Sequence, residues 1–220
     1  GEYAESVSRE NLGGPDNDTV IQAEIPGTVL LRGDVPVAEF AKGDGFQSVY
    51  AIDFERQVQS VNEIDTLTIV QMAPNLAELE FSPGGCYHDV AEKKLYISSS
   101  DMRPPETHHY SVSVIRGPGL LLLKPHRVIV DGLSATGFHS SVRLNHYPGN
   151  NTVWGFTAPG ATKCVIRNCT AFLNGGGIGV VSPKEGEGRN LIEKCQGFAN
   201  YTRHTVEGGN ICVFQSCNDE

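Results

Sequence analysis

The chain has 220 residues, of which 17 are Lys or Arg and 26 are Asp or Glu, so its formal net charge at pH 7 is −9. This acidic balance argues against a nucleic-acid or anionic-membrane partner, because both bind clustered Lys and Arg. No apolar run approaches the roughly 18 residues of a membrane-spanning helix, and 25 Gly and 12 Pro among recurring Val, Ile, Leu and Phe indicate a folded, turn-rich β protein.

Short runs typical of β-strands follow one another along the chain, most of them bounded by Gly, Pro, Asn or Asp. Six such runs are 19–23, 28–32, 66–70, 94–98, 111–115 and 127–130. Helical patterns are scarce. The best candidate is 54–64, whose apolar spacing could come from a short helix or from an irregular edge.

The second half of the chain repeats a unit made of a short strand, a polar corner, a second strand and a Gly-rich return. Four segments share this unit: 130–138, 166–174, 192–200 and 214–219. Their shared position holds Leu133, Cys169, Cys195 and Cys217. The unit suits one turn of a solenoid of three short strands, with turns stacked about 4.8 Å apart. The pattern of a leucine-rich repeat is absent, and a β-sandwich would not explain the recurring unit.

Longer segments resemble one known family. Residues 1–7 and 18–33 resemble its opening coils, 84–97 its inserted hairpin, and 126–138 its first regular coil. This is the right-handed parallel β-helix, or pectin-lyase-like, family in its secreted bacterial, carbohydrate-active form. The resemblance covers most of the chain, but its motifs identify a fold and not a reaction.

The resemblance implies an all-β solenoid in which residues 1–220 form a single domain. Residues 1–125 are expected to form irregular N-terminal coils with the hairpin, and 126–220 to form regular coils. It also implies truncation at one or both ends, because family members start before the segment that matches Gly1 and continue beyond Glu220.

In this family a substrate groove runs along the sheet formed by the strands that follow the Gly-rich returns. The candidate strands are 141–145, 177–181 and 203–207. Alternation directs Ile178 and Val180 inward. Two outward rows are expected: Arg143, Gly179 and Thr205 in one, and Asn145, Val181 and Glu207 in the other. The nearby loops add His139, His146, Lys184, Glu185, Arg203 and His204.

A uronate lyase is the first chemistry that fits these residues. It needs a base for the proton beside the substrate carboxylate and a cation that offsets the charge of that carboxylate. Arg143 could be the cation, and the base could be His139, His146 or His204. Asn145, Arg203 and Lys184 are candidates for substrate binding. Ca²⁺ held by carboxylates such as Glu207 is the one cofactor that this chemistry suggests.

A glycoside hydrolase is the second chemistry, and it needs two carboxyl groups about 5–9.5 Å apart. Glu207 is the one carboxylate on the expected outward rows. That shortage favours a lyase, or places the catalytic coils beyond residue 220. Each outward Arg or Glu, taken alone, is more often simply solvent-facing.

The predicted function is polysaccharide degradation by a secreted or cell-surface bacterial protein whose partner is a polysaccharide or a cell-surface glycan. The alternative is a non-catalytic β-helix for adhesion, glycan binding or structural assembly. Structural roles are expected for the cysteines, as a buried ladder and not as zinc ligands or disulfides. Similar roles are expected for His108 and His109 before a strand, and for Asp131, which can bond its own backbone at a corner.

Overall fold

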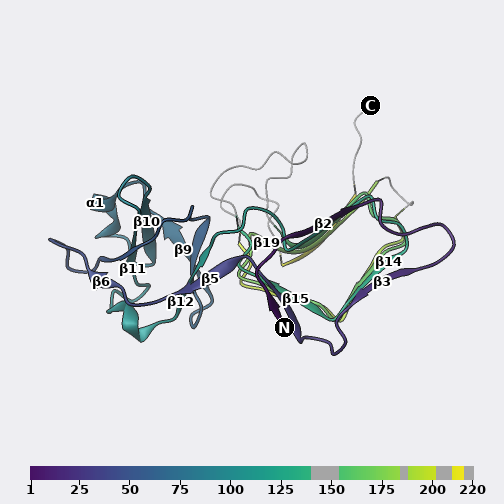
Figure 1. The fold of residues 1–220 in the computed structure, drawn as a ribbon, viewed down its shortest axis with the longest axis horizontal. Coiled ribbons are helices and arrows are strands. Elements are labelled where there is room, and N and C mark those ends of the chain that lie inside the picture. Colours follow the sequence, from purple (N-terminus) through teal and green to yellow (C-terminus); the bar gives the residue numbers. More distant parts are fainter. Residues whose placement is uncertain (140–153, 184–187, 202–209, 216–220) are drawn as a thin grey trace. The chain divides into compact units, whose positions relative to one another are not determined.

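The computed structural model describes residues 1–139, 154–183, 188–201 and 210–215. Almost all of their regular structure is β-strand, which confirms the expected all-β class (Figure 1). The chain divides into two compact units. Unit 1 comprises Gly1–Gly33 and Ile115–Glu220, and unit 2 comprises Asp34–Val114. The expectation of a single domain over 1–220 stays a prediction.

Unit 1 contains three parallel sheets, here named A, B and C. Sheet A has the order β1 (Glu2–Tyr3), β4 (Val29–Arg32), β15 (Leu133–Thr136), β18 (Thr170–Phe172), β21 (Gln196–Phe198). Sheet B has the order β2 (Val7–Glu10), β13 (Leu120–Leu123), β16 (Trp154–Pro159), β19 (Gly176–Ser182), β22 (Ile211–Gln215). Sheet C has the order β20 (Leu191–Glu193), β17 (Val165–Arg167), β14 (Val128–Asp131), β3 (Thr19–Gln22).

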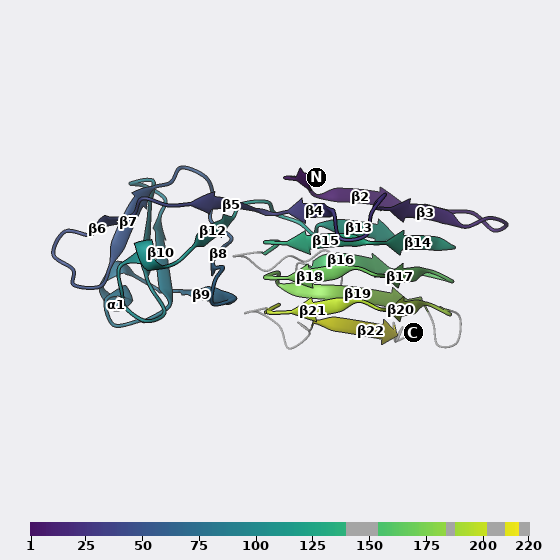
Figure 2. The same cartoon turned by 90° about the horizontal axis from the view of Figure 1, so that it is seen from below.

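The chain visits these sheets in the constant order B, C, A and then returns to sheet B. Coil 1 consists of β2, β3 and β4; coil 2 of β13, β14 and β15; coil 3 of β16, β17 and β18; and coil 4 of β19, β20 and β21. Figure 2 shows these coils as successive layers, from the purple strands near the N-terminus to the yellow β22. Each coil therefore adds one strand to each sheet, at the usual spacing of about 4.8 Å.

The register places equivalent residues of successive coils beside one another. In sheet A, Ser134 pairs with Thr170, and Thr170 pairs with Gln196. The residues directly before these three are Leu133, Cys169 and Cys195. The shared position predicted from the repeat is thus confirmed in three coils, while Cys217 lies outside the described residues.

Inward side chains from all three sheets form the core of unit 1. Its largest fully buried members are Phe138, Phe156 and Ile178, and Val180 is 1% exposed, so the predicted inward direction of Ile178 and Val180 is confirmed. Removal of this apolar surface from water is the main favourable contribution to folding.

The corners between sheets C and A hold residues with left-handed backbone. They are Gly132, Asn168 and Lys194, with φ of +74°, +53° and +51°. Asp131 precedes the first of these corners. Its carboxylate accepts hydrogen bonds from Arg167 Nε and Asn168 Nδ2, both at 2.7 Å, in the next coil. Asp131 therefore joins two coils, whereas a bond to its own backbone was the expectation.

Unit 2 is built on one eight-stranded sheet. Its order is β5 (Asp34–Val37), β12 (Tyr110–Ser113), β8 (Ser60–Glu63), β9 (Thr68–Met72), β10 (Gly85–Asp89), β11 (Lys94–Ser98), β7 (Tyr50–Asp53), β6 (Ala41–Lys42). All neighbours are antiparallel except β9 and β10. The short helix α1 (Leu76–Leu79) and the 3₁₀ turn η1 (Pro105–Thr107) complete the unit.

Two of the sequence predictions for unit 2 concern its hairpin and the segment 54–64. The hairpin expected over 84–97 is confirmed, because β10 and β11 pair in antiparallel register from Gly85 to Ser98. The helical interpretation of 54–64 is wrong, because this segment contains the strand β8, whose two faces are both buried. Among the described residues, no helix has the length and apolar composition needed to cross a membrane.

Candidate functional site

Most of the predicted site residues lie outside the described residues. These are Arg143, Asn145, His146, Lys184, Arg203, His204 and Glu207. Their predicted roles stay predictions, and so does the role of Glu185. His139 is the one predicted catalytic residue that the structure describes. The coils nevertheless show where each of these stretches of chain is anchored.

Six of these seven residues belong to connections from sheet A to sheet B. Residues 137–153 connect β15 to β16, and 199–210 connect β21 to β22. Between them in the stack, the short connection 173–175 joins β18 to β19. These connections, together with 115–119 before β13, are called here the A–B edge. The ends of both long connections are thus anchored at the same edge, two coils apart.

Asparagine side chains hold this edge together. Asn174 Oδ1 accepts from the backbone N–H of Phe138 at 3.0 Å, and Asn200 Oδ1 accepts from that of Asn174 at 3.1 Å. Asn210 Oδ1 accepts in the same way from Asn200 at 3.2 Å. The amides of Asn174 and Asn200 also donate to the backbone of the preceding coil, Asn174 Nδ2 to Ala135 O at 3.1 Å and Asn200 Nδ2 to Ala171 O at 2.8 Å. The ladder satisfies backbone groups where the chain leaves sheet A.

Phe138 fixes the first rung of this ladder. It is fully buried, and its ring lies against Gly33 and Gly119, where an added Cβ would come within 2.7 Å of a ring carbon. Glycine is therefore required at both positions for the ring to fit. The Gly-rich returns seen in the sequence serve this close packing as well as turning the chain.

His139 follows Phe138 and lies inside the edge. It is 6% exposed, and its Nε2 is 3.0 Å from the backbone oxygen of Leu173, so Nε2 carries the proton and donates it. This position keeps the imidazole away from solvent. The described contacts therefore make His139 a support for the connection between coils 2 and 3.

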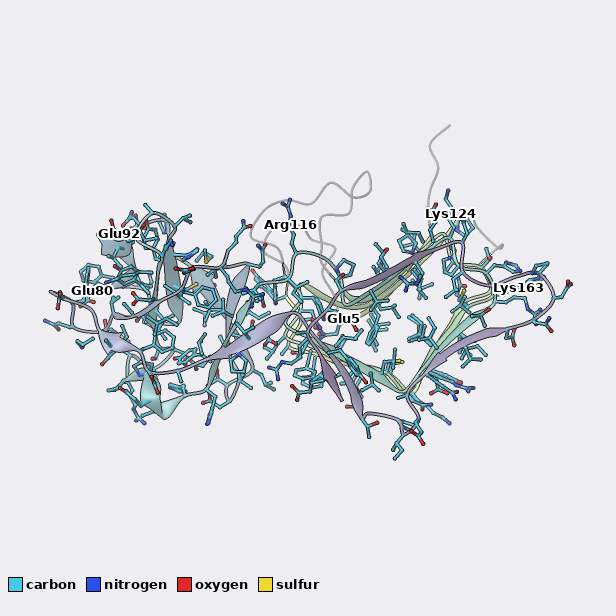
Figure 3. The ribbon with its side chains drawn as sticks, in the orientation of Figure 1. Glu5, Glu80, Glu92, Arg116, Lys124 and Lys163 are labelled. Atoms are coloured by element: carbon cyan, nitrogen blue, oxygen red, sulfur yellow. The ribbon has the colours of Figure 1, made fainter. Side chains whose placement is uncertain are left out.

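Arg116 is the charged residue of this edge that sequence reasoning missed. It forms a parallel backbone bridge with His139, and its side chain is exposed and projects from the ribbon (Figure 3). Among the described residues, its guanidinium has no hydrogen-bond or ion-pair partner. The signal that could have found it is Arg116-Gly-Pro-Gly119, a glycine-rich return directly before a strand.

Lys184 is anchored elsewhere. It belongs to the connection from β19 in sheet B to β20 in sheet C, so it departs from the opposite end of the sheet B strand. The seven residues of β19 span about 23 Å at the usual strand rise. Chain connectivity therefore separates the anchor of Lys184 from that of the other candidates.

The outward face of sheet B differs from the expected groove. Gly179 pairs with Thr157 on one side and Cys212 on the other, so the expected row of Arg143, Gly179 and Thr205 is wrong. On the side of the preceding coil, β19 pairs with β16. This strand starts at Trp154, later in the chain than the segment 141–145 that the sequence predicted as the neighbouring strand. In the central strands β13, β16 and β19, the outward positions are Leu121, Leu123, Thr157, Pro159, Gly179 and Val181. None of them is titratable.

Unit 2 contains a cluster of ionisable side chains, here called the His108 cluster. His108 Nδ1 lies 2.7 Å from Asp65 Oδ2, and Nε2 lies 3.2 Å from Asp101 Oδ1. Glu63, which is fully buried, lies 3.6 Å from Nδ1. Desolvation lowers the pKa of His108, but the hydrogen bonds to both Asp side chains and the charge of Glu63 outweigh it and raise the pKa.

Glu63 is held ionised by its hydrogen bonds. Its Oε1 accepts from Ser100 Oγ at 2.6 Å and from Thr66 Oγ1 at 2.8 Å, and its Oε2 accepts from Tyr110 Oη at 2.9 Å. Burial raises the pKa of this carboxyl, but these bonds outweigh burial and the pKa is lowered. Because carboxylates occupy both nitrogens of His108, neither nitrogen can take a proton from a substrate. The His108 cluster is a structural network, as expected for His108.

Cys164, Cys169 and Cys195 of the repeats are free thiols. Cys169 and Cys195 occupy neighbouring coils of the ladder, and the hydrogen bond between them, together with burial, raises the pKa of Cys169. A neutral, buried thiol is a poor nucleophile and a poor metal ligand. Over the residues that the structure describes, no group of three or more His, Cys, Asp or Glu side chains could hold a metal ion.

Comparison of the chain with protein-family models, with characterised proteins and with solved structures finds no match. Functional assignment therefore starts from the residues and geometry of this chain alone.

Proposed function

We propose that unit 1 is a right-handed parallel β-helix and that the protein degrades an extracellular polysaccharide at the A–B edge. Three parallel sheets visited in constant order support the helix. Connections between parallel strands of one sheet are right-handed in about 98% of cases, which favours that hand. The proposal includes a secreted or cell-surface location, as the sequence resemblance implies.

The observation that carries the site is the place of Arg116. Arg116 carries an exposed guanidinium without a partner among the described residues, and its backbone pairs with that of His139 at the edge where 137–153 and 199–210 are both anchored. A guanidinium binds a carboxylate through two parallel hydrogen bonds. Arg116 would thus hold a uronate carboxylate and offset the charge that develops on it during proton removal.

The remaining roles come from residues outside the described part of the chain. Arg143, His146, His204 and Glu207 are the proposed catalytic groups, and Asn145 and Arg203 the proposed substrate-binding groups. Elimination would use a histidine as base, and hydrolysis would need Glu207 with a second carboxyl group. Ca²⁺ stays a suggestion that depends on Glu207, and no step is assigned to it. Lys184, anchored at the other end of sheet B, is proposed to contact a more distant part of the polysaccharide.

One observation favours the alternative of a non-catalytic β-helix. The outward positions of β13, β16 and β19 carry no titratable group. An adhesive or structural solenoid needs only such a face, since binding requires no acid or base. Only the enzyme would cleave the polysaccharide, so an assay for new reducing ends distinguishes the two functions.

Variants of the full chain test the proposed site. Arg116→Ala and Glu207→Gln should each lower the release of new reducing ends from an acidic polysaccharide by at least about tenfold, because each variant loses a charge-assisted interaction in the transition state. Lys163→Ala, an exposed cation at the corner between β16 and β17, is the matched control and should keep full activity. Equal activity of Arg116→Ala and Lys163→Ala would remove Arg116 from the site.

A further inference from the structure

Unit 2 contains a pocket that the proposed polysaccharide site does not use. Its volume is about 700 Å³, within the usual range of roughly 300–1,000 Å³ for ligand sites. It opens on the face of the sheet opposite the core of unit 2, where β6, β7 and β11 lie side by side. All of its lining residues belong to unit 2.

The floor of this pocket combines an aromatic ring with small side chains. Tyr96 of β11 pairs with Ala51 of β7, and Ala51 pairs with Ala41 of β6, so the three lie in one row. Tyr96 is half-buried and Ala41 is exposed. The two methyl groups leave space above the sheet beside the phenol ring. Phe46 and Leu76 add apolar surface at the sides.

The walls of the pocket are held in place by Glu80. Its carboxylate accepts hydrogen bonds from the backbone N–H groups of Gln47 at 2.7 Å and Ser48 at 3.3 Å, and Ser48 Oγ donates to Glu80 O at 3.2 Å. Desolvation raises the pKa of Glu80, but these bonds outweigh it and lower the pKa. They tie the loop that carries Phe46 to the end of α1. A site held in this way loses little conformational entropy on binding.

Four charged side chains on the pocket have no hydrogen-bond or ion-pair partner among the described residues. They are Glu39, Asp44, Asp53 and Lys94. Lys42, also on the lining, is engaged by Gln47 O and by the ring of Tyr50, 4.6 Å from Nζ. The free groups therefore offer three acceptors and one donor around the floor.

We infer that this pocket binds a neutral sugar unit of a glycan chain. A pyranose ring has an apolar face of C–H groups and a rim of hydroxyl groups. The face fits the ring of Tyr96 and the methyl groups of Ala41 and Ala51, and the hydroxyls can donate to Asp53 and Glu39 and accept from Lys94. The lining carries three carboxylates and, with Lys42 and Lys94, two ammonium groups, so its net charge of −1 disfavours a uronate and the ligand carries no carboxylate. The pocket is formed by residues of unit 2 and the A–B edge by residues of unit 1, so binding at the pocket does not depend on catalysis at the edge.

Binding of the full chain to neutral oligosaccharides tests this inference. Cello-, manno-, xylo- and galacto-hexasaccharides are titrated by calorimetry, with oligogalacturonate and oligolysine as charged competitors. At least one neutral hexasaccharide should bind, and Tyr96→Ala should weaken it by about tenfold or more. Asp53→Asn should weaken it by about tenfold through loss of a charged acceptor.

Two further variants separate binding from folding. Ala51→Leu fills the floor of the pocket without removing a contact, so it should abolish binding while the melting temperature stays close to that of the natural protein. Glu92→Gln, in the turn of the β10–β11 hairpin outside the pocket, should bind normally (Figure 3). The inference is overturned by absence of neutral-sugar binding, by binding that survives Ala51→Leu, or by tighter binding of oligogalacturonate or oligolysine. Catalysis at the A–B edge is measured in a separate assay, by the release of new reducing ends, so failure of the pocket inference can be distinguished from failure of the proposed function.

Discussion

Buried asparagines and one buried glutamate show how single residues stabilise this chain. Asn174 is fully buried and satisfies two backbone groups of the preceding coil, and Glu63 is fully buried with several hydrogen-bond donors. Burial of such groups without partners costs several kcal/mol, so they stabilise the fold only when every polar atom of the network has a hydrogen-bond partner. Removal of one member should therefore cost more than removal of an exposed equivalent.

Substitution of Asn174 tests the ladder at the A–B edge. Asn174→Ala leaves the backbone N–H of Phe138 and the backbone oxygen of Ala135 without these partners in a buried site. The expected loss in the free energy of unfolding is about 2–4 kcal/mol, from roughly 1–3 kcal/mol for each buried group left unsatisfied. Asn17→Ala, at an exposed position of unit 1, should change it by less than about 0.5 kcal/mol. Urea unfolding measures both, and similar losses would contradict the role of the ladder.

The His108 cluster predicts a pH optimum for the stability of unit 2. The pKa of His108 is raised from 6.5, so its stabilisation is complete below about pH 6.5 and is lost as pH rises through the raised pKa. The pKa values of Glu63, Asp65 and Asp101 are lowered, so their contribution is present above about pH 4.5 and is lost as pH falls through the lowered values. Maximal stability is expected between these limits.

His108→Gln removes the alkaline part of this dependence. The variant is expected to be less stable than the natural protein at pH 6 and to lose no further stability from pH 6 to 9. Urea equilibration at each pH, followed by pulsed hydrogen exchange of β8 and β12 at one labelling pH, measures this directly. A natural protein whose midpoint is constant from pH 6 to 9 would show that His108 carries no charge-dependent stabilisation.

At the scale of elements, glycines set how closely neighbouring coils approach. A Cβ added at Gly177 in β19 would lie 2.0 Å from the backbone oxygen of Asn210 in the next coil. Asn210 O also accepts from the N–H of Ile178 at 3.0 Å, so this backbone cannot move away without losing a sheet hydrogen bond. Close packing between neighbouring coils therefore requires glycine at this position of β19.

Gly177→Ala should therefore destabilise unit 1 by about 1–3 kcal/mol, the usual cost of overpacking. Gly14→Ala is the matched control, because nothing lies within 4 Å of its added Cβ and its φ is not in the left-handed region. It should change the free energy of unfolding by less than about 0.5 kcal/mol. Thermal unfolding distinguishes them, and equal melting temperatures would contradict the close approach.

At the scale of the whole molecule, the sequence predicts the coils of unit 1 well because their residues repeat. Leu133, Cys169 and Cys195 share one position in the sequence and in sheet A. Alternation also predicts the inward residues of β19. It does not identify the neighbours of β19, because 141–145 and Trp154–Pro159 are both compatible with a strand and only pairing distinguishes them.

Long-range contacts limit prediction in unit 2. The His108 cluster unites Glu63, Asp65 and Asp101 with His108, and no local pattern links these positions. The pocket over Tyr96 likewise depends on the register of three strands. The apolar spacing of segment 54–64 fits both a short helix and an irregular edge. The strand β8 forms within this segment because it pairs with β9 and β12, and these contacts are not visible in the local sequence.

Turnover of a polysaccharide is the most direct test of the proposed function. The full chain is incubated with a broad panel of acidic and neutral polysaccharides, and new reducing ends are measured together with the ultraviolet absorbance of unsaturated products. Reducing ends should appear on at least one acidic polysaccharide, with absorbance if the reaction is an elimination. Binding without new reducing ends on any member of the panel would contradict degradation and favour the non-catalytic β-helix.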